Sequence, residues 1–408
     1  MPAARILIIS NGPLCRNPRV VKEASTLGRA GHDVTVLTVR NHAPSETHDL
    51  ELLRDAPYRR ETVDMLPGFG ASRSTVFCRR LRLWASRKTP SIFKNYISGA
   101  LGPTAALLSH ARRLSSDLVI VHNEAPHWVG TQLIKDGRRV CADLEDWHSE
   151  DLLPRDSVRR PLGLIRNVER TLLHHAAHTT TTSHALADAI HTRYGGRRPH
   201  VIGNAFPLQS DPRTGAPGEP PVFFWFSQTL GPGRGLELFF AAWKLTKRPS
   251  RVVLLGEVHG DYAQRLLGRL PAERRAHVSF RPLVSPAELP SVIARHDIGL
   301  ALEQSFIVNR NLTITNKIIQ YLNAGLAVVA SDTAGQREVL AHAPDAGIIV
   351  ETHETTRFAT ALDALLADRT ALQHRQRAAR QLAEQTYCWE REGPHLTELV
   401  TRTLTTPA

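Results

Sequence analysis

The chain has 408 residues, of which 42% are apolar and 22% are charged, and it carries a net charge of +12. This length usually forms two domains, and this apolar fraction excludes an intrinsically disordered protein. No apolar run approaches the roughly 18 residues of a membrane-spanning helix, so the sequence predicts none. Nucleic acid is disfavoured as a partner, because the chain lacks zinc-finger spacing and aromatic residues interleaved with basic ones. The positive charge is left with three explanations: an anionic membrane, an anionic small substrate, or solubility alone.

The cysteine pattern bears on metal binding and on the cellular compartment. Cys15, Cys78, Cys141 and Cys388 are scattered along the chain without CxxC spacing. This spacing argues against zinc ligation and against a disulfide framework. The sequence therefore predicts no metal site, and it fits a protein of the reducing cytoplasm.

The first half alternates strands and helices. Residues 5–10, RILIIS, predict a buried first strand rather than a signal peptide, and an Asn-Gly-Pro turn follows. A helix over 18–32 and a strand over 33–39 complete a βαβ unit, which a parallel sheet requires. Further strands are predicted at 117–122, 139–146, 178–183 and 200–204, with helices at 128–137 and 184–195. This alternation predicts a doubly wound α/β domain.

A second set of strands begins after a proline-rich segment. Residues 206–221 hold five prolines without periodicity, so they predict a linker. Strands are then predicted at 221–227, 251–257, 277–283, 297–303 and 327–332, with helices between them. The sequence thus predicts two α/β halves of similar size, whose sheets present their carboxyl ends to a ligand.

The turn after the first strand of the second half is rich in glycine. It contains Gly231, Pro232, Gly233, Arg234 and Gly235, and a helix is predicted from about Gly235. Glycines allow a close backbone approach, the helix N-terminus attracts negative charge, and arginine adds several donors. The turn therefore predicts a phosphate site, and the alternative is a tight turn with a surface arginine. It matches neither GxxxxGK[ST] nor GxGxxG, which disfavours nucleotide hydrolysis and dinucleotide binding.

A second polar stretch lies between residues 311 and 340. Asn316 and Lys317 are predicted in the first turn of a helix over 316–325, where a lysine is unfavourable unless an anion binds. Glu338 is predicted at the start of the next helix, where a carboxylate caps the helix or accepts sugar hydroxyls.

The segment GLAVVASDTAGQREV, residues 325–339, resembles the signature of family 4-type glycosyltransferases of the GT-B fold. Residues 18–38, 169–204 and 277–302 resemble other parts of the same family in the same order. The resemblance implies two Rossmann-like, doubly wound parallel-sheet domains facing a central cleft. It also implies sugar transfer from a nucleotide-diphosphate sugar with retention of configuration, without an obligatory metal and without a cofactor beyond the donor.

The resemblance divides the chain into four parts. Residues 1–205 are expected to form the acceptor-side domain and residues 222–385 the nucleotide-sugar domain, joined by the linker 206–221. Residues 386–408 are expected to form a helix that crosses back to the first domain. The acceptor is expected to be a glycan, a lipid-linked glycan or a small molecule, as in cell-envelope or polysaccharide biosynthesis.

The resemblance also implies residue roles. The expected catalytic residues are His122, Arg234 and Lys317. The expected substrate-binding residues are Gly12, Gln228, Gly233, Gly235, Thr315, Asn316, Gln320 and Glu338. His122 matches a histidine that contacts the donor sugar, and its alternative role is to cap a strand end. A polar cluster follows the strand at 139–146 and is interpreted either as an acceptor-binding site or as a polar loop; it consists of Glu145, Asp146, His148 and Glu150.

The sequence departs from the family pattern at three places. Gln228 stands where the family has a phosphate-binding arginine, and Gln320 replaces the second of two family glutamates. The first glutamate falls near Leu312 or Thr313, so it too is absent. Lys317, in an Asn-Lys pair, is expected to restore the charge lost at Gln228. These departures leave two rivals open: a non-catalytic sugar-nucleotide-binding protein and a sugar-nucleotide epimerase of the same fold.

Residues 79–98, RRLRLWASRKTPSIFKNYIS, combine six basic residues with Leu81, Leu83, Trp84, Ile92, Phe93 and Tyr96. No acidic residue interrupts them. One interpretation is peripheral contact with an anionic membrane at its inner face. The other is a solvated helix whose apolar residues pack inward.

Overall fold

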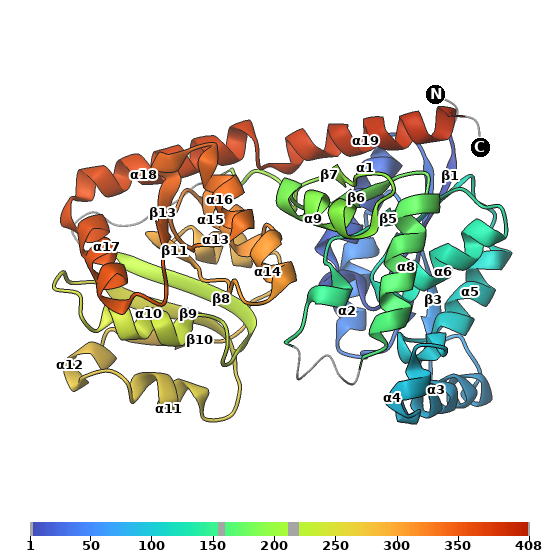
Figure 1. Cartoon of the computed structure of the whole chain (residues 1–408), viewed down its shortest axis with the longest axis horizontal. Helices are drawn as coiled ribbons and strands as arrows, with labels where there is room; N and C mark the ends of the chain where they lie inside the picture. The colour runs from blue at the N-terminus through green and yellow to red at the C-terminus, as the bar shows by residue number, and fades with distance from the viewer. Residues whose placement is uncertain (1–2, 154–159, 211–219, 407–408) are drawn as a thin grey trace. The chain divides into compact units, whose positions relative to one another are not determined.

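A computed structural model describes residues 3–153, 160–210 and 220–406 (Figure 1). The chain forms two compact units. The first consists of residues 1–202 together with 393–408, and the second of residues 203–392. The chain therefore passes between units at 202–203 and returns at 392–393, a few residues from the boundaries that the sequence suggests at 205 and 386. None of the helices in the described ranges is both long and apolar enough to cross a bilayer.

The first unit is built on a parallel sheet with the order β3-β2-β1-β4-β5-β6-β7 among its described residues. Its strands are β1 (Arg5–Ile9), β2 (Asp33–Arg40), β3 (Arg59–Asp64), β4 (Leu118–His122), β5 (Val140–Asp143), β6 (Thr179–Thr181) and β7 (His200–Val201). The strands predicted from sequence are confirmed in position. Strand β3 was not predicted, because this edge strand is mostly polar and half exposed.

Helices connect these strands. They are α1 (Pro18–Arg29), α2 (Ser45–Leu53), α3 (Arg73–Lys88), α4 (Ser91–Lys94), α5 (Thr104–Arg113), α6 (Glu124–Lys135), α8 (Leu162–His175) and α9 (His184–Tyr194). Pro18 opens α1, because its fixed φ suits the first helical position. Three short 3₁₀ turns also occur: η1 (Leu14–Arg16), η2 (Ser98–Ala100) and η3 (His148–Glu150).

The second unit has a parallel sheet with the order β10-β9-β8-β11-β12-β13 in the described part of the chain. Its strands are β8 (Val222–Leu230), β9 (Arg251–Val258), β10 (Val278–Arg281), β11 (Ile298–Ala301), β12 (Ala327–Ser331) and β13 (Gly347–Val350). The helices are α10 (Leu236–Trp243), α11 (Tyr262–Leu267), α12 (Ala272–Arg275), α13 (Leu289–Ile293), α14 (Val308–Leu312), α15 (Asn316–Ala324), α16 (Ala334–Ala341), α17 (Thr355–Ala367) and α18 (Arg369–Gln385). A turn η4 (Pro344–Ala346) precedes β13, and α19 (Trp389–Thr405) begins in this unit and continues into the first.

The unbroken apolar run of β8 packs on both faces of its sheet. Phe223 and Trp225 belong to a core that includes residues of α10 and α17. Phe224 and Phe226 point the other way, into a core that includes residues of α15 and α18. Because both faces are covered, every position of the strand can be apolar, as the sequence indicated.

The start of the predicted linker is fixed to the second unit. The Phe206 carbonyl accepts from the Trp389 N–H at 3.0 Å, and the Pro207 carbonyl accepts from Asn323 Nδ2 at 2.7 Å. Arg380 Nη2 donates to the Gln209 carbonyl at 2.9 Å. Residues 206–209 are therefore part of the second unit, and residues 211–219 of the predicted linker lie outside the described residues.

Candidate active site

The glycine-rich turn leads from β8 into α10. Gly233 and Gly235 have φ angles of +76° and +79°, which L side chains rarely adopt. At Gly235 a Cβ would also lie 2.5 Å from the Leu302 carbonyl oxygen, whereas at Gly233 nothing lies within 4 Å. Gly235 therefore brings the N-terminus of α10 against the segment that follows β11.

That segment carries a carboxylate that faces several cations. Lys317 Nζ lies 2.9 Å from Glu303 Oε1, and both side chains are only 13% exposed. Lys317 Nζ also lies 5.6 Å from the centre of the Trp225 ring. Burial alone would raise the pKa of Glu303, but the charges of Lys317, Arg310 and Arg234 hold it below its ordinary value.

Two of the residues implied by the sequence act electrostatically on Glu303. Lys317 lies in the first turn of α15, as predicted, and Arg234 lies just before α10. Lys317 is paired with Glu303, and the charges of Arg234 and Arg310 also act on this carboxylate, so these four residues together carry an excess of positive charge. We call them the cation cluster.

Polar atoms next to the cation cluster lack partners. Thr315 Oγ1 and Asn316 Oδ1 are buried but have no hydrogen-bond partner among the described residues. No side chain caps the N-terminus of α15, so its first backbone N–H groups also lack a side-chain acceptor. Buried polar groups are normally paired, and such groups together with the positive charge describe a site that accepts an anionic, hydroxyl-bearing ligand.

The base of this site is cross-linked by hydrogen bonds. Ser331 Oγ donates to the Glu303 carbonyl at 2.6 Å. Gln336 Nε2 donates to Ser331 Oγ at 2.9 Å and to the Ser331 carbonyl at 3.1 Å. The segment bearing Glu303 is therefore fixed to the end of β12 and to the first turn of α16.

Two other expected substrate-binding residues lie elsewhere in the second unit. Gln228 is exposed, at an irregularity of β8 where the pairing with β9 shifts register between Phe226 and Thr229. Gln320 lines a hollow of about 460 Å³ with Asn323, Pro286, Pro290, Ser291 and residues 206–210. No contact that we describe joins these residues to the cation cluster, and their roles stay predictions.

The position expected for Glu338 needs correction. The helix begins at Ala334, because Thr333 accepts from the Gln336 N–H at 3.3 Å and caps it. Glu338 is the fifth residue of α16, not at its start, so it does not cap the helix. Gly335 instead occupies the first turn, where a Cβ would lie 2.4 Å from the Thr313 carbonyl oxygen.

In the first unit, His122 ends β4 and is buried, with 2% of its surface exposed. Its Nε2 lies 2.5 Å from Glu23 Oε2, and its Nδ1 lies 3.1 Å from Asp143 Oδ2. Arg19 holds the same Asp143 with two bonds, at 2.6 and 2.8 Å. His122, Glu23, Asp143 and Arg19, two cations and two anions, are linked by ion pairs, and we call these four residues the buried network.

The buried network sets the charge of His122. Burial alone would lower the pKa of the imidazole, but the charge of Glu23 and the hydrogen bond to Asp143 raise the pKa to about 10. Both ring nitrogens are occupied, and the ring ties α1 to the ends of β4 and β5. Contact between His122 and a donor sugar stays a prediction, and the geometry gives this residue a structural role as well.

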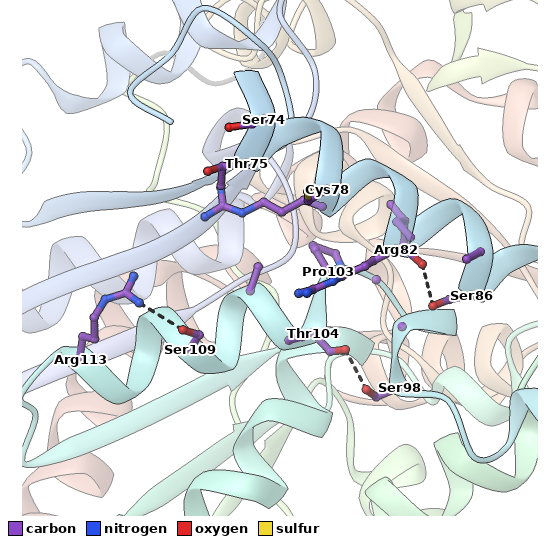
Figure 2. Close-up of a pocket in the computed structure, with 17 residues that line it drawn as sticks. Ser74, Thr75, Cys78, Arg82, Ser86, Ser98, Pro103, Thr104, Ser109 and Arg113 are labelled. Carbon is purple, nitrogen blue, oxygen red and sulfur yellow. Dashed lines mark hydrogen bonds between the residues drawn. The ribbon is translucent and has the colours of Figure 1, made fainter. Parts of the chain in front are cut away.

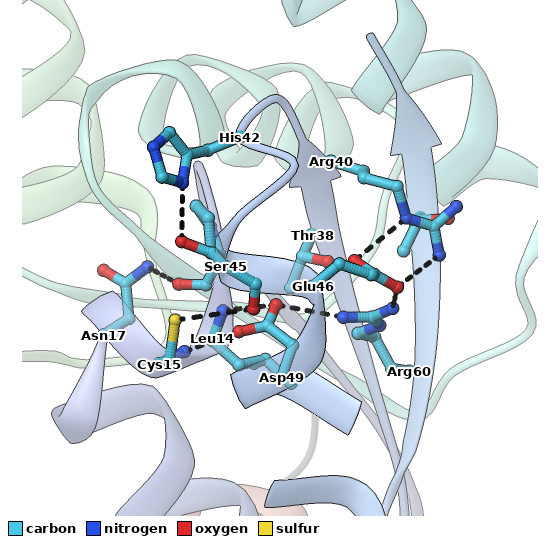
Figure 3. Close-up of polar contacts among 12 residues, drawn as sticks. Leu14, Cys15, Asn17, Thr38, Arg40, His42, Ser45, Glu46, Asp49 and Arg60 are labelled. Atoms are coloured by element: carbon cyan, nitrogen blue, oxygen red, sulfur yellow. Dashed lines mark hydrogen bonds and ion pairs between the residues drawn. The ribbon is translucent and has the colours of Figure 1, made fainter. Parts of the chain in front are cut away.

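The loop after β1 contains Gly12, with a φ of +123°. Asp49, from α2, accepts from the Leu14 and Cys15 N–H groups at 3.0 and 2.8 Å (Figure 3). Arg60 donates to Asp49 at 2.9 Å and so fixes the carboxylate. This loop is therefore held in place by α2 and β3, which leaves the role of Gly12 in binding a prediction.

Asn123 was not predicted from the sequence. It is the one non-glycine residue in the described ranges with a positive φ, at 69°. Its Oδ1 accepts from Ser10 Oγ at 3.2 Å and from the Asn11 N–H at 3.3 Å. Residues with such a strained backbone cluster at functional sites. In the sequence, the signal that points to Asn123 is its position directly after His122.

The polar cluster after β5 makes contacts within the first unit. Glu150 accepts from Arg166 at 3.1 Å, and the neighbouring Ser149 donates to the buried carboxylate of Glu169 at 2.7 Å. His148 lies 3.8 Å from Glu124. These contacts hold the loop around η3 in place. They neither support nor contradict a part for this loop in acceptor binding, which stays a prediction.

Glu303 and Arg310 were also not assigned from the sequence. Glu303 is the last residue of the predicted strand 297–303, and a carboxylate at the carboxyl end of a parallel strand is a signal for a ligand site. Arg310 lies on α14, and nothing in its spacing indicates that its charge acts on Glu303. In the described residues, no group of three histidine, cysteine or acidic side chains is arranged to hold a metal ion.

Two family models match the chain. A "Glycosyl transferase 4-like domain" matches residues 17–205, and "Glycosyl transferases group 1" matches residues 220–368. Together they span most of both units. The chain therefore belongs to the glycosyltransferases, in agreement with the resemblance seen in its signature segment. No curated protein matches it in sequence.

Solved structures are similar along the whole chain. Sucrose-phosphate synthase from Thermosynechococcus elongatus has a TM-score of 0.71 at 16% identity, with 98% of each chain covered. Anabaena HepE, in a complex with UDP-glucose, has a TM-score of 0.70 at 18% identity, covering 98% of this chain and 100% of that one. A glycosyltransferase from Rickettsia africae has a TM-score of 0.69 at 14% identity, with both chains fully covered. At these identities the likeness establishes the fold, which is GT-B.

Proposed function

We propose that the chain transfers a sugar from a nucleotide-diphosphate sugar to an acceptor, and that the cation cluster binds the diphosphate. The observation that carries this proposal is the excess of positive charge around Glu303, beside buried polar atoms that lack partners. Lys317 and Arg234 each lie at the N-terminal end of a helix, and this position favours phosphate. The UDP-glucose complex of HepE supports a nucleotide sugar as the donor.

The chemistry follows from where charge develops. As the bond between the sugar and the diphosphate breaks, negative charge grows on the leaving phosphate, and preorganised cations stabilise it. Lys317 and Arg234 are the residues proposed for this work. Glu303 holds Lys317 in place through its 2.9 Å ion pair.

We further propose that transfer retains the anomeric configuration, as the resemblance implies. The acceptor oxygen then bonds to the sugar on the face that the diphosphate leaves, and its proton passes to the departing phosphate. The acceptor class, which is a glycan, a lipid-linked glycan or a small molecule, is part of the proposal. So is a cytoplasmic location.

A binding protein without transferase activity is the second candidate. Gln228 and Gln320 favour it, because each carries an amide where the family pattern has a charge. Measuring donor hydrolysis and product formation with and without acceptors separates the two candidates. A donor that binds but is never cleaved, across UDP and GDP sugars and several acceptor classes, would support the second.

Titration calorimetry with UDP and GDP sugars tests the diphosphate site. Arg234→Ala and Lys317→Ala should each weaken donor binding by about 1.5–3 kcal/mol, or roughly 10- to 150-fold, because each removes a charge-assisted hydrogen bond. Matched controls are Arg248→Ala and Lys247→Ala, which remove exposed cations of the same unit. Equal affinity in both cluster variants and both controls would show that the diphosphate binds elsewhere.

A further inference from the structure

Helix α3 presents its apolar side chains outward. Phe77, Leu81 and Trp84 are 66%, 49% and 59% exposed, and their spacing of four and three residues places them on one face. In contrast, Val76 is the one fully buried residue of this helix. A helix on a globular protein normally turns its apolar face to the core, whereas the described part of the chain leaves this face uncovered.

Basic side chains border the same face. Arg73, Arg80, Arg87 and Lys88 are exposed, and the described residues form no ion pair with them. Around this helix no aspartate or glutamate occurs from residue 65 to residue 116, a stretch that holds nine lysines and arginines. Nothing within this stretch can therefore neutralise the cations.

The opposite side of α3 is also basic. A groove of about 710 Å³ separates α3 from α5, and Arg79, Arg82 and Arg113 are among its lining residues (Figure 2). Arg79 donates to the Asp64 carbonyl at 2.9 Å, and Arg113 donates to Ser109 at 3.1 Å. The groove and the outer face are therefore two different faces of α3, and both carry arginines.

The outer face continues beyond α3. Phe93 and Tyr96, on and just after α4, are 55% and 85% exposed. With Pro67, Arg73 and Arg80, the apolar residues of α3 also line a shallow hollow of about 650 Å³. We define the α3–α4 surface by these exposed residues: Arg73, Phe77, Arg80, Leu81, Trp84, Arg87, Lys88, Phe93 and Tyr96.

We propose that the α3–α4 surface docks on an anionic lipid bilayer. The bilayer supplies what this surface lacks: an apolar layer for Phe77, Leu81 and Trp84, and negative charge for the cations around them. Aromatic side chains favour the headgroup region, which fits Trp84 and Tyr96. A second copy of the chain fits poorly, because pairing two such surfaces would place cations against cations.

This proposal deepens the proposed function but does not depend on it for its test. If the chain is a transferase, docking through the predicted acceptor-side unit selects a lipid-linked acceptor over a soluble one. Vesicle binding needs neither donor nor acceptor. A failure of the proposed function would therefore leave the docking result unchanged, and the reverse also holds.

Co-sedimentation of the full chain with vesicles tests the proposal. The chain should bind vesicles of phosphatidylcholine mixed with phosphatidylglycerol, and it should bind vesicles of phosphatidylcholine alone far less. Binding should weaken as salt rises from about 0.1 M to about 1 M, because the Debye length falls from about 10 Å to about 3 Å. No binding to the anionic vesicles at low salt would overturn the proposal.

Two sets of variants locate the surface. The triple variant Arg73→Glu, Arg80→Glu, Arg87→Glu should lose at least tenfold in partitioning, since each cation near the membrane contributes about fivefold. Its control is Arg170→Glu with Arg193→Glu, on exposed positions of α8 and α9. Phe77→Ser with Trp84→Ser should also lose binding, whereas Leu50→Ser, at an exposed apolar position of α2, should not.

Quenching by brominated lipids gives a second readout. Trp84 should be quenched in anionic vesicles, and Trp84→Phe should remove most of the quenching, since the other five tryptophans lie outside the surface. Equal binding by the triple variant and its control, or unchanged quenching in Trp84→Phe, would show that another face contacts the lipid.

Discussion

The two units use buried charge in opposite ways. In the buried network of the first unit, His122 and Arg19 pair with Glu23 and Asp143, so each of the four charges has a partner of opposite sign and each ring nitrogen of His122 is occupied. In the cation cluster of the second unit, Lys317 pairs with Glu303, and the charges of Arg310 and Arg234 also act on this carboxylate. The comparison suggests that charge balance, rather than the presence of charged residues, separates a structural network from a ligand site.

The charge balance of the buried network and of the cation cluster also predicts how the protein responds when one of their residues is mutated. Breaking a buried ion-paired network leaves an uncompensated buried charge, so stability should suffer most. Removing one cation from a site with an excess of positive charge leaves less buried charge uncompensated. Stability should therefore change less, and ligand binding should suffer most. The predictions below test this division.

The largest effect is expected at His122. His122→Gln keeps a polar side chain but removes the positive charge between Glu23 and Asp143, so it should cost about 3–5 kcal/mol in the free energy of unfolding. Urea unfolding of the full chain measures it. His191→Gln, at an exposed position on α9, is the control and should change little. A loss below about 1 kcal/mol for His122→Gln would mean that the positive charge of His122 does not stabilise the pair of carboxylates, Glu23 and Asp143.

The same residue predicts a pH dependence. The folded pKa of His122 is about 10 and its unfolded pKa is about 6.5, so its stabilising effect is full below about pH 6.5 and is lost as the pH rises through 10. The stability difference between the wild type and His122→Gln should shrink over this window. Unfolding experiments at pH 6, 8 and 10 measure it, with about 1.4 kcal/mol per pH unit as the steepest slope. If the stability difference stays constant across the three pH values, the buried network does not keep the His122 ring protonated.

Two glycines of the same turn offer a matched pair. Gly233→Ala should cost only the backbone strain of its positive φ, about 1–2 kcal/mol, because its Cβ meets nothing. Gly235→Ala adds a contact of 2.5 Å with the Leu302 carbonyl, so it should cost more and also displace Arg234 from the cation cluster. Thermal unfolding and donor titration should both rank Gly235→Ala as the worse variant. Equal effects would show that the close approach relaxes without consequence.

Local pattern was enough for most of the fold. The run at Val222–Phe226 predicted a fully buried strand, because only a strand covered on both faces keeps an unbroken apolar sequence. Strand β13 (Gly347–Val350) was not predicted, since four residues carry too little periodicity. Residues 206–209 looked like a linker from their prolines, but their hydrogen bonds to α15 and α18 depend on tertiary contacts.

The site was predictable only where a single segment carries the chemistry. Arg234 and Lys317 stood out because a glycine-rich turn or a helix start marks each of them. The pairing of Lys317 with Glu303 spans 14 residues and two elements, so no local pattern contains it. The buried network is more distant still, because Glu23 and His122 are 99 residues apart.

The smallest effect is expected at Gln228, where the family pattern has an arginine. Gln228→Arg adds a cation at an exposed position of β8, so donor affinity should rise by at most about 1 kcal/mol, the range of exposed ion pairs. Thr229→Arg adds the same charge one residue further along the strand, where the side chain is also exposed and regular pairing with β9 resumes. A gain for Gln228→Arg alone would place residue 228 beside the diphosphate, and the cation cluster would then extend to the end of β8. Equal gains would reflect only the added net charge, and would leave Lys317 as the residue that compensates for the amide at Gln228.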